Sequence, residues 1–124
     1  MYVGIAKISL VIGDSHSLKD KRMVLRKIKD RVRERIGVVV NEVGDLDVWQ
    51  RSELGCAVVS NDHAKANELL DGVVRMVVGD GVEITAIARD VSTFQGESVR
   101  FADKVTAADP NWVPDEWKDQ LEGK

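Results

Sequence analysis

The spacing of apolar residues along the chain predicts six regular elements. Four segments rich in β-branched residues are typical of strands, and two segments whose apolar residues recur every three or four positions are typical of helices. The strands are expected at residues 2–11, 38–43, 51–60 and 82–91, and the helices at about 18–36 and between the cap at 61 or 62 and the glycines at 79–81.

Each predicted helix carries signals at its ends and one apolar stripe. Ser17 followed by Asp20 is a capping-box-like start for the first helix, and Gly37 is expected to end it. Asn61 or Asp62 is expected to cap the second helix. The residues expected to face the core are Leu18, Leu25, Ile28, Val32 and Ile36 on the first helix, and Ala66, Leu69, Leu70, Val73 and Val77 on the second.

The order strand, helix, strand, strand, helix, strand predicts an α+β protein. The rules for connections between strands favour the ferredoxin-like βαββαβ fold, a four-stranded antiparallel sheet with two helices on one face. Residues 1–92 are expected to form this domain. Residues 93–124 show no sustained period and are expected to be a C-terminal extension, partly flexible, with a short helix near its end.

The sheet face without helices is expected to expose apolar side chains unless something covers it. These side chains are Val3, Ile5, Val59 and Ile87. A homodimer through the open sheet face would bury them, and so would the chain's own extension with Trp112 and Trp117. The sequence leaves both covers open.

The length and the cysteine content limit the class of protein. A chain of 124 residues is a common size for one domain. No apolar run approaches the ~20 residues of a membrane helix, so no membrane partner is expected.

The N-terminal segment contains Lys7 and lacks a small-residue cleavage site, which favours a strand over a signal peptide. The single cysteine, Cys56, excludes an internal disulfide and favours a cytoplasmic location.

Charge is distributed very unevenly along the chain. The segment from Lys19 to Arg35 has nine bases and three acids, a net charge of +6. The chain after Val40 has eight bases and seventeen acids, a net charge of −9. Such an uneven distribution of charge indicates what the protein binds rather than how it folds.

Five cations form a row along one side of the first predicted helix, which we call the basic row. They are Lys19, Arg22, Arg26, Lys29 and Arg33. The row flanks the apolar stripe, so it is expected to border the sheet or an adjoining groove. Because like charges in a row repel one another, an anion such as an RNA backbone would stabilise them. The alternative is a solvated charged face, and the net charge of −3 disfavours indiscriminate binding of nucleic acids.

Lys21 lies apart from this row, on the side of the first helix that carries Leu25 and Ile28. One interpretation is that a carboxylate from a neighbouring strand, Glu42 or Glu53, holds its ammonium group. The other is that the aliphatic stem of Lys21 covers the core while the charge reaches solvent.

The connection between the two middle strands carries a second candidate site for partner binding. Its residues are Asp47, Trp49, Gln50 and Arg51, with Asp45 close by. A surface loop with an aromatic residue is typical of a contact with a protein or ligand. The alternative is that Trp49 folds back over a sheet edge while the acids keep the loop soluble. Asp45 and Asp47 supply two carboxylates, but the sequence places no further metal ligand beside them. No metal site is therefore predicted in this loop.

No catalytic, metal or cofactor site is expected. The segment GDSHS after the first strand has no arginine and one glycine, so it does not fit the phosphate cradle of an acylphosphatase. His16 in this segment has no orienting acid assigned, and two histidines with one cysteine form no soft-ligand cluster. The central strands carry no Phe or Tyr on their expected open face, which argues against base stacking on the sheet.

Two motifs in the chain resemble a known family. The sequence SLKDKR at the first helix and the sequence NEVGDLDVWQRSELGCAVVSND across the middle strands are similar to the YlxP-like family of small bacterial proteins. The resemblance covers roughly residues 2–91 and implies a ferredoxin-like fold, a cytoplasmic location and no established catalytic activity. Family genes often lie beside genes for translation initiation and ribosome maturation, and some members are called ribosome-binding factors. The extension with Trp112 and Trp117 goes beyond the family pattern.

Two functional hypotheses follow. The first is a non-catalytic accessory protein of the ribosome or of RNA, which binds phosphates through the basic row. The second is a homodimeric protein-interaction or ligand-sensing module, which uses the loop with Trp49 or the open sheet face.

Overall fold

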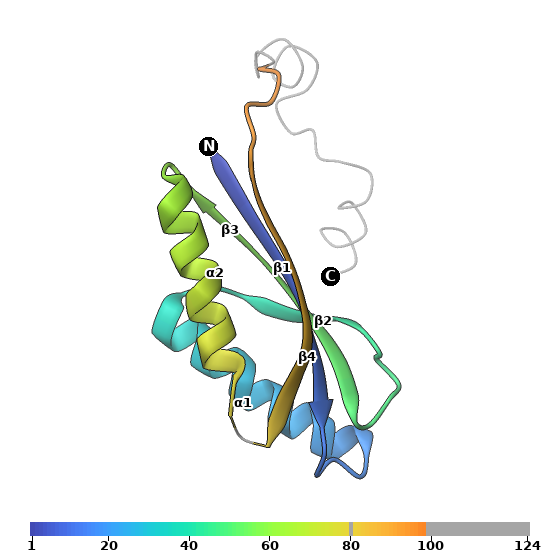
Figure 1. Cartoon of the computed structure of the whole chain (residues 1–124). Helices are drawn as coiled ribbons and strands as arrows, with labels where there is room; N and C mark the ends of the chain where they lie inside the picture. The colour runs from blue at the N-terminus through green and yellow to red at the C-terminus, as the bar shows by residue number, and fades with distance from the viewer. Residues whose placement is uncertain (80, 99–124) are drawn as a thin grey trace, which may run out of the picture. The chain divides into compact units, whose positions relative to one another are not determined.

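The computed structural model describes residues 1–79 and 81–98. Its elements follow the predicted order (Figure 1): β1 Tyr2–Ile12, α1 Leu18–Ile36, β2 Val40–Gly44, β3 Arg51–Ser60, α2 His63–Val77 and β4 Val82–Thr93. Residues Met1–Phe94 form one compact unit. The predicted flexibility of the extension, its short helix and both of its tryptophans lie outside the described residues.

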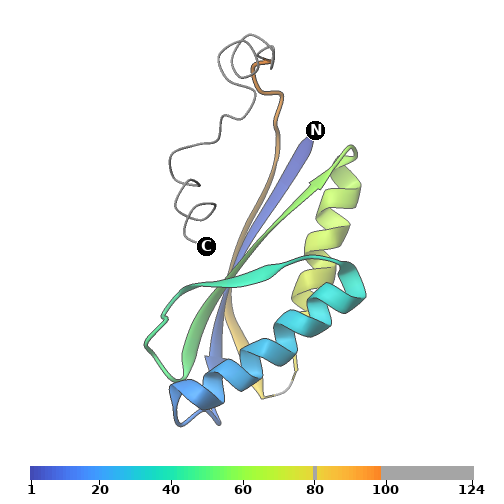
Figure 2. The same cartoon turned by 180° about the vertical axis from the view of Figure 1, so that it is seen from behind.

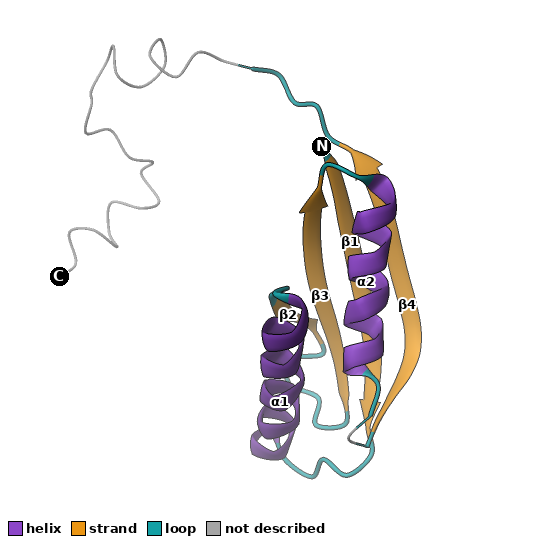
Figure 3. Ribbon diagram, turned by 90° about the vertical axis from the view of Figure 1, so that its left-hand side faces the viewer, coloured by secondary structure: helices purple, strands orange, loops and turns teal. Residues whose placement is uncertain are grey.

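The sheet is antiparallel throughout, with strand order β2-β3-β1-β4. Both helices lie on one side of it, α1 over β2 and α2 over β1 (Figure 3). The ferredoxin-like βαββαβ prediction is therefore confirmed. Figure 2 shows β2 running back along α1, so that the β2–β3 loop lies beside the N-terminal end of that helix.

The caps explain why α1 begins and ends where the sequence predicts. The Ser17 hydroxyl accepts a hydrogen bond from the backbone N–H of Asp20 at 3.0 Å, and the Asp20 carboxylate accepts one from the N–H of His16 at 3.1 Å. At the other end, Gly37 adopts a left-handed conformation with φ of 77°. A residue with a side chain is disfavoured there, so the helix stops. Asp62 caps α2 through the N–H of Ala64.

The core lies between the helices and the sheet. Its largest members from β1 and the helices are Ile8, Leu10, Ile12, Leu25, Ile28, Val32, Leu70, Val73 and Val77. Leu18, Ile36 and Leu69 are only half-buried, because they lie at the edges of the predicted stripes. Gly4 allows α2 to approach β1 closely, since a Cβ atom at Gly4 would lie 2.8 Å from Val58 Cγ2 and 3.0 Å from Leu70 Cδ1.

The open sheet face has the predicted apolar character in its centre. Val3 pairs with Val59 in the register, and Ile5 pairs with Ala57. The side chains of Ile5 and Val59 are 53% and 61% exposed. This face therefore presents apolar surface to solvent within the described unit.

Ile87 does not belong to that face, so this part of the prediction is wrong. Ile87 pairs with the buried Ile8, and paired residues share a face, so Ile87 lies on the helix side. A register shift between Ser9 and Leu10 also places Ile84 opposite Leu10, on the same side. The bulge inverts the alternation along β4, and a simple period of two cannot predict it.

Candidate nucleic-acid interface

The basic row borders a groove between α1 and β2, as its position beside the apolar stripe predicts. The groove has a volume of about 360 Å³. The cations that line it are Arg22, Arg26, Lys29 and Arg33, and the opposite wall is formed by Val39, Val40, Asn41 and Glu42. Lys19, the first residue of the row, is exposed but does not line the groove.

Three of the four groove cations have no acidic partner in residues 1–79 and 81–98. Arg33 forms an ion pair with Asp30 at 3.1 Å. Arg22, Arg26 and Lys29 form no ion pair with any residue of this described part. The second acid of the groove, Glu42, is neutralised by a residue outside it. The groove therefore keeps a surplus of about three positive charges.

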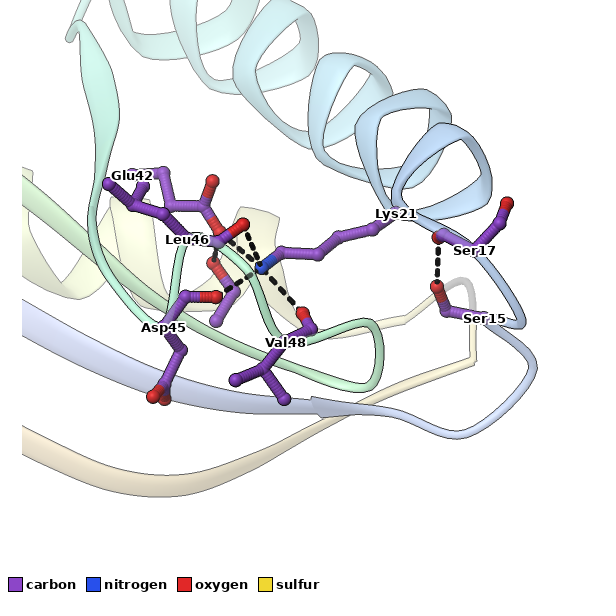
Figure 4. A network of polar contacts seen from close by, with 8 residues as sticks. Ser15, Ser17, Lys21, Glu42, Asp45, Leu46 and Val48 are labelled. Atoms are coloured by element: carbon purple, nitrogen blue, oxygen red, sulfur yellow. Dashed lines mark hydrogen bonds and ion pairs between the residues drawn. The ribbon is translucent and has the colours of Figure 1, made fainter.

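Lys21 is the residue that neutralises Glu42. Its side chain is 2% exposed, and its ammonium nitrogen lies 2.8 Å from Glu42 Oε2 (Figure 4). The same nitrogen donates hydrogen bonds to the backbone carbonyls of Asp45 at 2.6 Å and Val48 at 2.7 Å. It also lies 3.5 Å from the carbonyl oxygen of Leu46. An ammonium group has three protons, so these acceptors satisfy it completely.

This geometry settles the alternatives for Lys21. Glu42 is its partner, Glu53 is not, and the interpretation that the charge reaches solvent is wrong. The Glu42 carboxylate also accepts a hydrogen bond from the buried hydroxyl of Ser52 at 2.7 Å. A buried charge is tolerated when it is paired and fully hydrogen-bonded, as it is here.

The β2–β3 loop is held in one conformation by these contacts. Lys21 joins two of its carbonyls, and the N–H of Val48 donates to the carbonyl of Asp45 at 3.1 Å. Asp45 adopts a left-handed conformation with φ of 56°, which Asp tolerates better than most residues. At the end of the loop, the N–H of Ile12 donates to the carbonyl of Gln50 at 2.8 Å.

Trp49 does not fold back over the sheet, so that alternative is wrong. Its side chain is 53% exposed. Three of the four predicted partner-binding residues, Asp47, Trp49 and Gln50, line one shallow depression together with Val48. The fourth, Arg51, is exposed at the start of β3 and does not line it.

Comparison with known proteins places the chain in a family. The family described as "Protein of unknown function (DUF503)" matches residues 3–89. The chain belongs to the DUF503 family.

One relative of this DUF503 member is "Uncharacterized protein YlxP" of Bacillus subtilis (strain 168). It is 36% identical over 75 residues, which are 60% of this chain and 82% of the relative. Among solved structures, the solution NMR structure of a de novo designed protein with a ferredoxin fold has a TM-score of 0.51 at 14% identity. That similarity covers 81% of this chain and 93% of the designed protein, and it shows the fold alone.

The two motifs that resemble YlxP-like proteins have structural roles in this DUF503 member. Ser17 and Asp20 of SLKDKR form the cap of α1, and Lys21 of the same motif holds the loop. Glu42 and Ser52, from the second motif, complete the network around Lys21. In this chain the two motifs therefore connect the start of α1 to the β2–β3 loop.

Outside the groove and the loop, the described residues gather no set of groups typical of catalysis. No cluster of three or more His, Cys, Asp or Glu side chains that could hold a metal occurs in the part searched. His16 is exposed, and its N–H serves the cap of α1. Burial raises the pKa of the half-buried Cys56 thiol, which disfavours its nucleophilic thiolate form. None of the described helices is long and apolar enough to span a membrane.

Sequence reasoning missed the wall of the groove opposite the cations. Val39 and Asn41 carry no charge, Val39 lies outside both quoted motifs, and Val39 is 62% exposed. Residues 38–41 are three valines and an asparagine, so no alternation of apolar and polar residues marks this segment in the sequence. In the fold Val38 and Val40 are buried, whereas Val39 and Asn41 are exposed.

Proposed function

We propose that this chain is a non-catalytic accessory protein that binds RNA, with the ribosome as its expected site of action. It binds the phosphate backbone through Arg22, Arg26 and Lys29 in the groove between α1 and β2. Arg33 and Lys19 extend the same surface. The association with the ribosome rests on the resemblance to YlxP-like proteins, and the groove supports the contact with a polyanion.

One observation carries this proposal. The groove contains two acids, and both are paired, Asp30 with Arg33 and Glu42 with Lys21. The three remaining cations have no acidic partner in the described residues, so their charge is available to an external anion. Phosphate contacts of this kind supply affinity without sequence preference.

The test is a salt titration of the binding of the full chain to a labelled single-stranded RNA and to ribosomal subunits. Three phosphate contacts predict that affinity falls roughly 20- to 40-fold between 50 and 200 mM salt. The variant Arg22→Ala/Arg26→Ala/Lys29→Ala is expected to lose most of this salt dependence together with the binding.

A matched control removes three other exposed cations. The variant Lys27→Ala/Lys65→Ala/Arg75→Ala has the same net charge, but none of its residues lines the groove. Binding that persists in this control and is lost in the groove variant supports the proposal. Equal loss in both variants, or no binding by the wild type at low salt, contradicts it.

The exposed apolar centre of the sheet favours a second candidate, a homodimer through the open sheet face. Ile5 and Val59 lie on adjacent strands and are more than half exposed. If this face is an interface, Ile5→Lys/Val59→Lys is expected to convert a dimer into a monomer in sedimentation velocity. A dimer of this variant would have to bury two lysine charges of each chain in the interface. Wild-type protein that sediments as a monomer rules out this candidate.

A further inference from the structure

The β2–β3 loop combines a rigid backbone with exposed apolar side chains. Leu46 and Trp49 are 60% and 53% exposed, although Lys21 binds the carbonyls of Asp45 and Val48, the residues that directly precede them. A loop that is already ordered loses little conformational entropy when it binds. An exposed tryptophan on such a loop is typical of an interface anchor.

The charges of the loop indicate the chemistry of its partner. Asp45 and Asp47 are exposed beside Leu46, and neither forms an ion pair within the described residues. Two carboxylates disfavour contact with a phosphate backbone. The complement of this loop is therefore an apolar pocket with positively charged residues around it.

A pocket of that kind lies between α1 and α2, and we call it the α1–α2 socket. Its volume is about 360 Å³. Ile36, Leu69 and Met76, all half-buried, supply its apolar lining.

Exposed charges surround the α1–α2 socket, namely Arg35, Lys65, Arg75 and Glu68. None of these three cations is ion-paired with a residue in the described ranges. The rim thus carries three positive charges and one negative charge, a surplus of two that matches the two carboxylates of the loop.

The loop cannot reach the socket of its own chain. It is anchored at Lys21, in the first turn of α1, whereas the socket begins at Arg35, in the last turn. Fourteen residues of helix separate these two positions by roughly 21 Å. We propose that the β2–β3 loop of one copy docks into the α1–α2 socket of a second copy, with Trp49 as its anchor.

Such a contact is head-to-tail. Each copy that offers its loop retains an empty socket, so association can continue beyond two chains. The contact uses no residue that lines the groove between α1 and β2. It can therefore be present or absent independently of RNA binding.

Sedimentation velocity of the full chain tests this proposal across a wide range of protein concentration at low and high salt. The wild type is expected to associate with increasing concentration, and less at high salt. Trp49→Ala and Lys65→Glu/Arg75→Glu are each expected to weaken association at least about tenfold. Met23→Ala and Lys27→Glu, which change an exposed apolar residue and an exposed cation elsewhere on α1, are matched controls.

A mixture of the two variants provides the decisive measurement. The Trp49→Ala chain keeps its socket, and the Lys65→Glu/Arg75→Glu chain keeps its loop. Together they are expected to form a complex of one chain of each that grows no further. The proposal is overturned if the wild type stays monomeric, if association persists in both variants, or if the mixture remains monomeric while circular dichroism shows both variants folded.

Discussion

Lys21→Met is expected to lower the free energy of unfolding by about 3–5 kcal/mol. Methionine has a similar shape but no charge, so Glu42 keeps a poorly solvated carboxylate with no cation beside it. The carbonyl of Val48 also loses its donor, and the carbonyl of Asp45 keeps only the N–H of Val48. Urea unfolding followed by circular dichroism measures the loss.

Two further variants show whether the loss comes from the buried ion pair. Lys27→Met removes an exposed lysine six residues along the same helix and should change stability by less than about 0.5 kcal/mol. Lys21→Met/Glu42→Leu should recover part of the loss, since an apolar pair replaces the unpaired carboxylate. Recovery stays incomplete because the carbonyl of Val48 still lacks a donor and the carbonyl of Asp45 has lost one of its two. A Lys21→Met variant as stable as Lys27→Met would contradict this account of the network.

Leu70→Ala is expected to cost about 2–5 kcal/mol. Leu70 is fully buried and lies directly above Gly4, where α2 packs on β1. Removing its side chain leaves a cavity that two rigid elements cannot close. Thermal or urea unfolding measures the cost, and Val59→Ala on the open sheet face is the control, with an expected change within about 0.5 kcal/mol.

The close approach at Gly4 makes a second measurement possible. In the wild type, Gly4→Ala places a Cβ atom 3.0 Å from Leu70 Cδ1 and 2.8 Å from Val58 Cγ2, so the packing must shift. In the Leu70→Ala background one of these contacts is gone. Gly4→Ala should then cost at least about 0.5 kcal/mol less than in the wild type. If the stability losses of Gly4→Ala and Leu70→Ala simply add in the double variant, the contact between Leu70 and Gly4 does not hold α2 against β1.

The sequence predicts the helices and the overall topology well because their signals are local. Ser17 and Gly37 mark the ends of α1, and both have the backbone geometry that these residue types favour. The basic row is likewise predictable, since helical spacing alone places its members on one side. What the row faces depends on tertiary contacts, and the wall from Val39 to Glu42 becomes visible only in the folded chain.

The environment of Lys21 could be predicted only in part. The sequence offers Glu42 as a partner, but the other acceptors are backbone carbonyls, which every residue carries. No pattern of side chains reveals where such carbonyls converge. The exposure of Trp49 follows from the same network, because the fixed loop directs it outwards.

The position of Ile87 cannot be predicted from the sequence for a different reason. One extra residue in β4 between the partners of Ser9 and Leu10 reverses the faces of every residue that follows the bulge in the register. Sequence periodicity assumes an uninterrupted ladder, so a single bulge is enough to move an isoleucine to the opposite side of the sheet.

The beginning and the end of the compact unit meet. The N–H of Phe94 donates to the carbonyl of Met1 at 2.8 Å, immediately beyond the pairing of Tyr2 with Thr93. A unit whose two ends are neighbours can be spliced into an exposed turn of another protein without stretching its host. It can also be reopened elsewhere after its original ends are joined, which makes this small fold a practical module for engineering fusions.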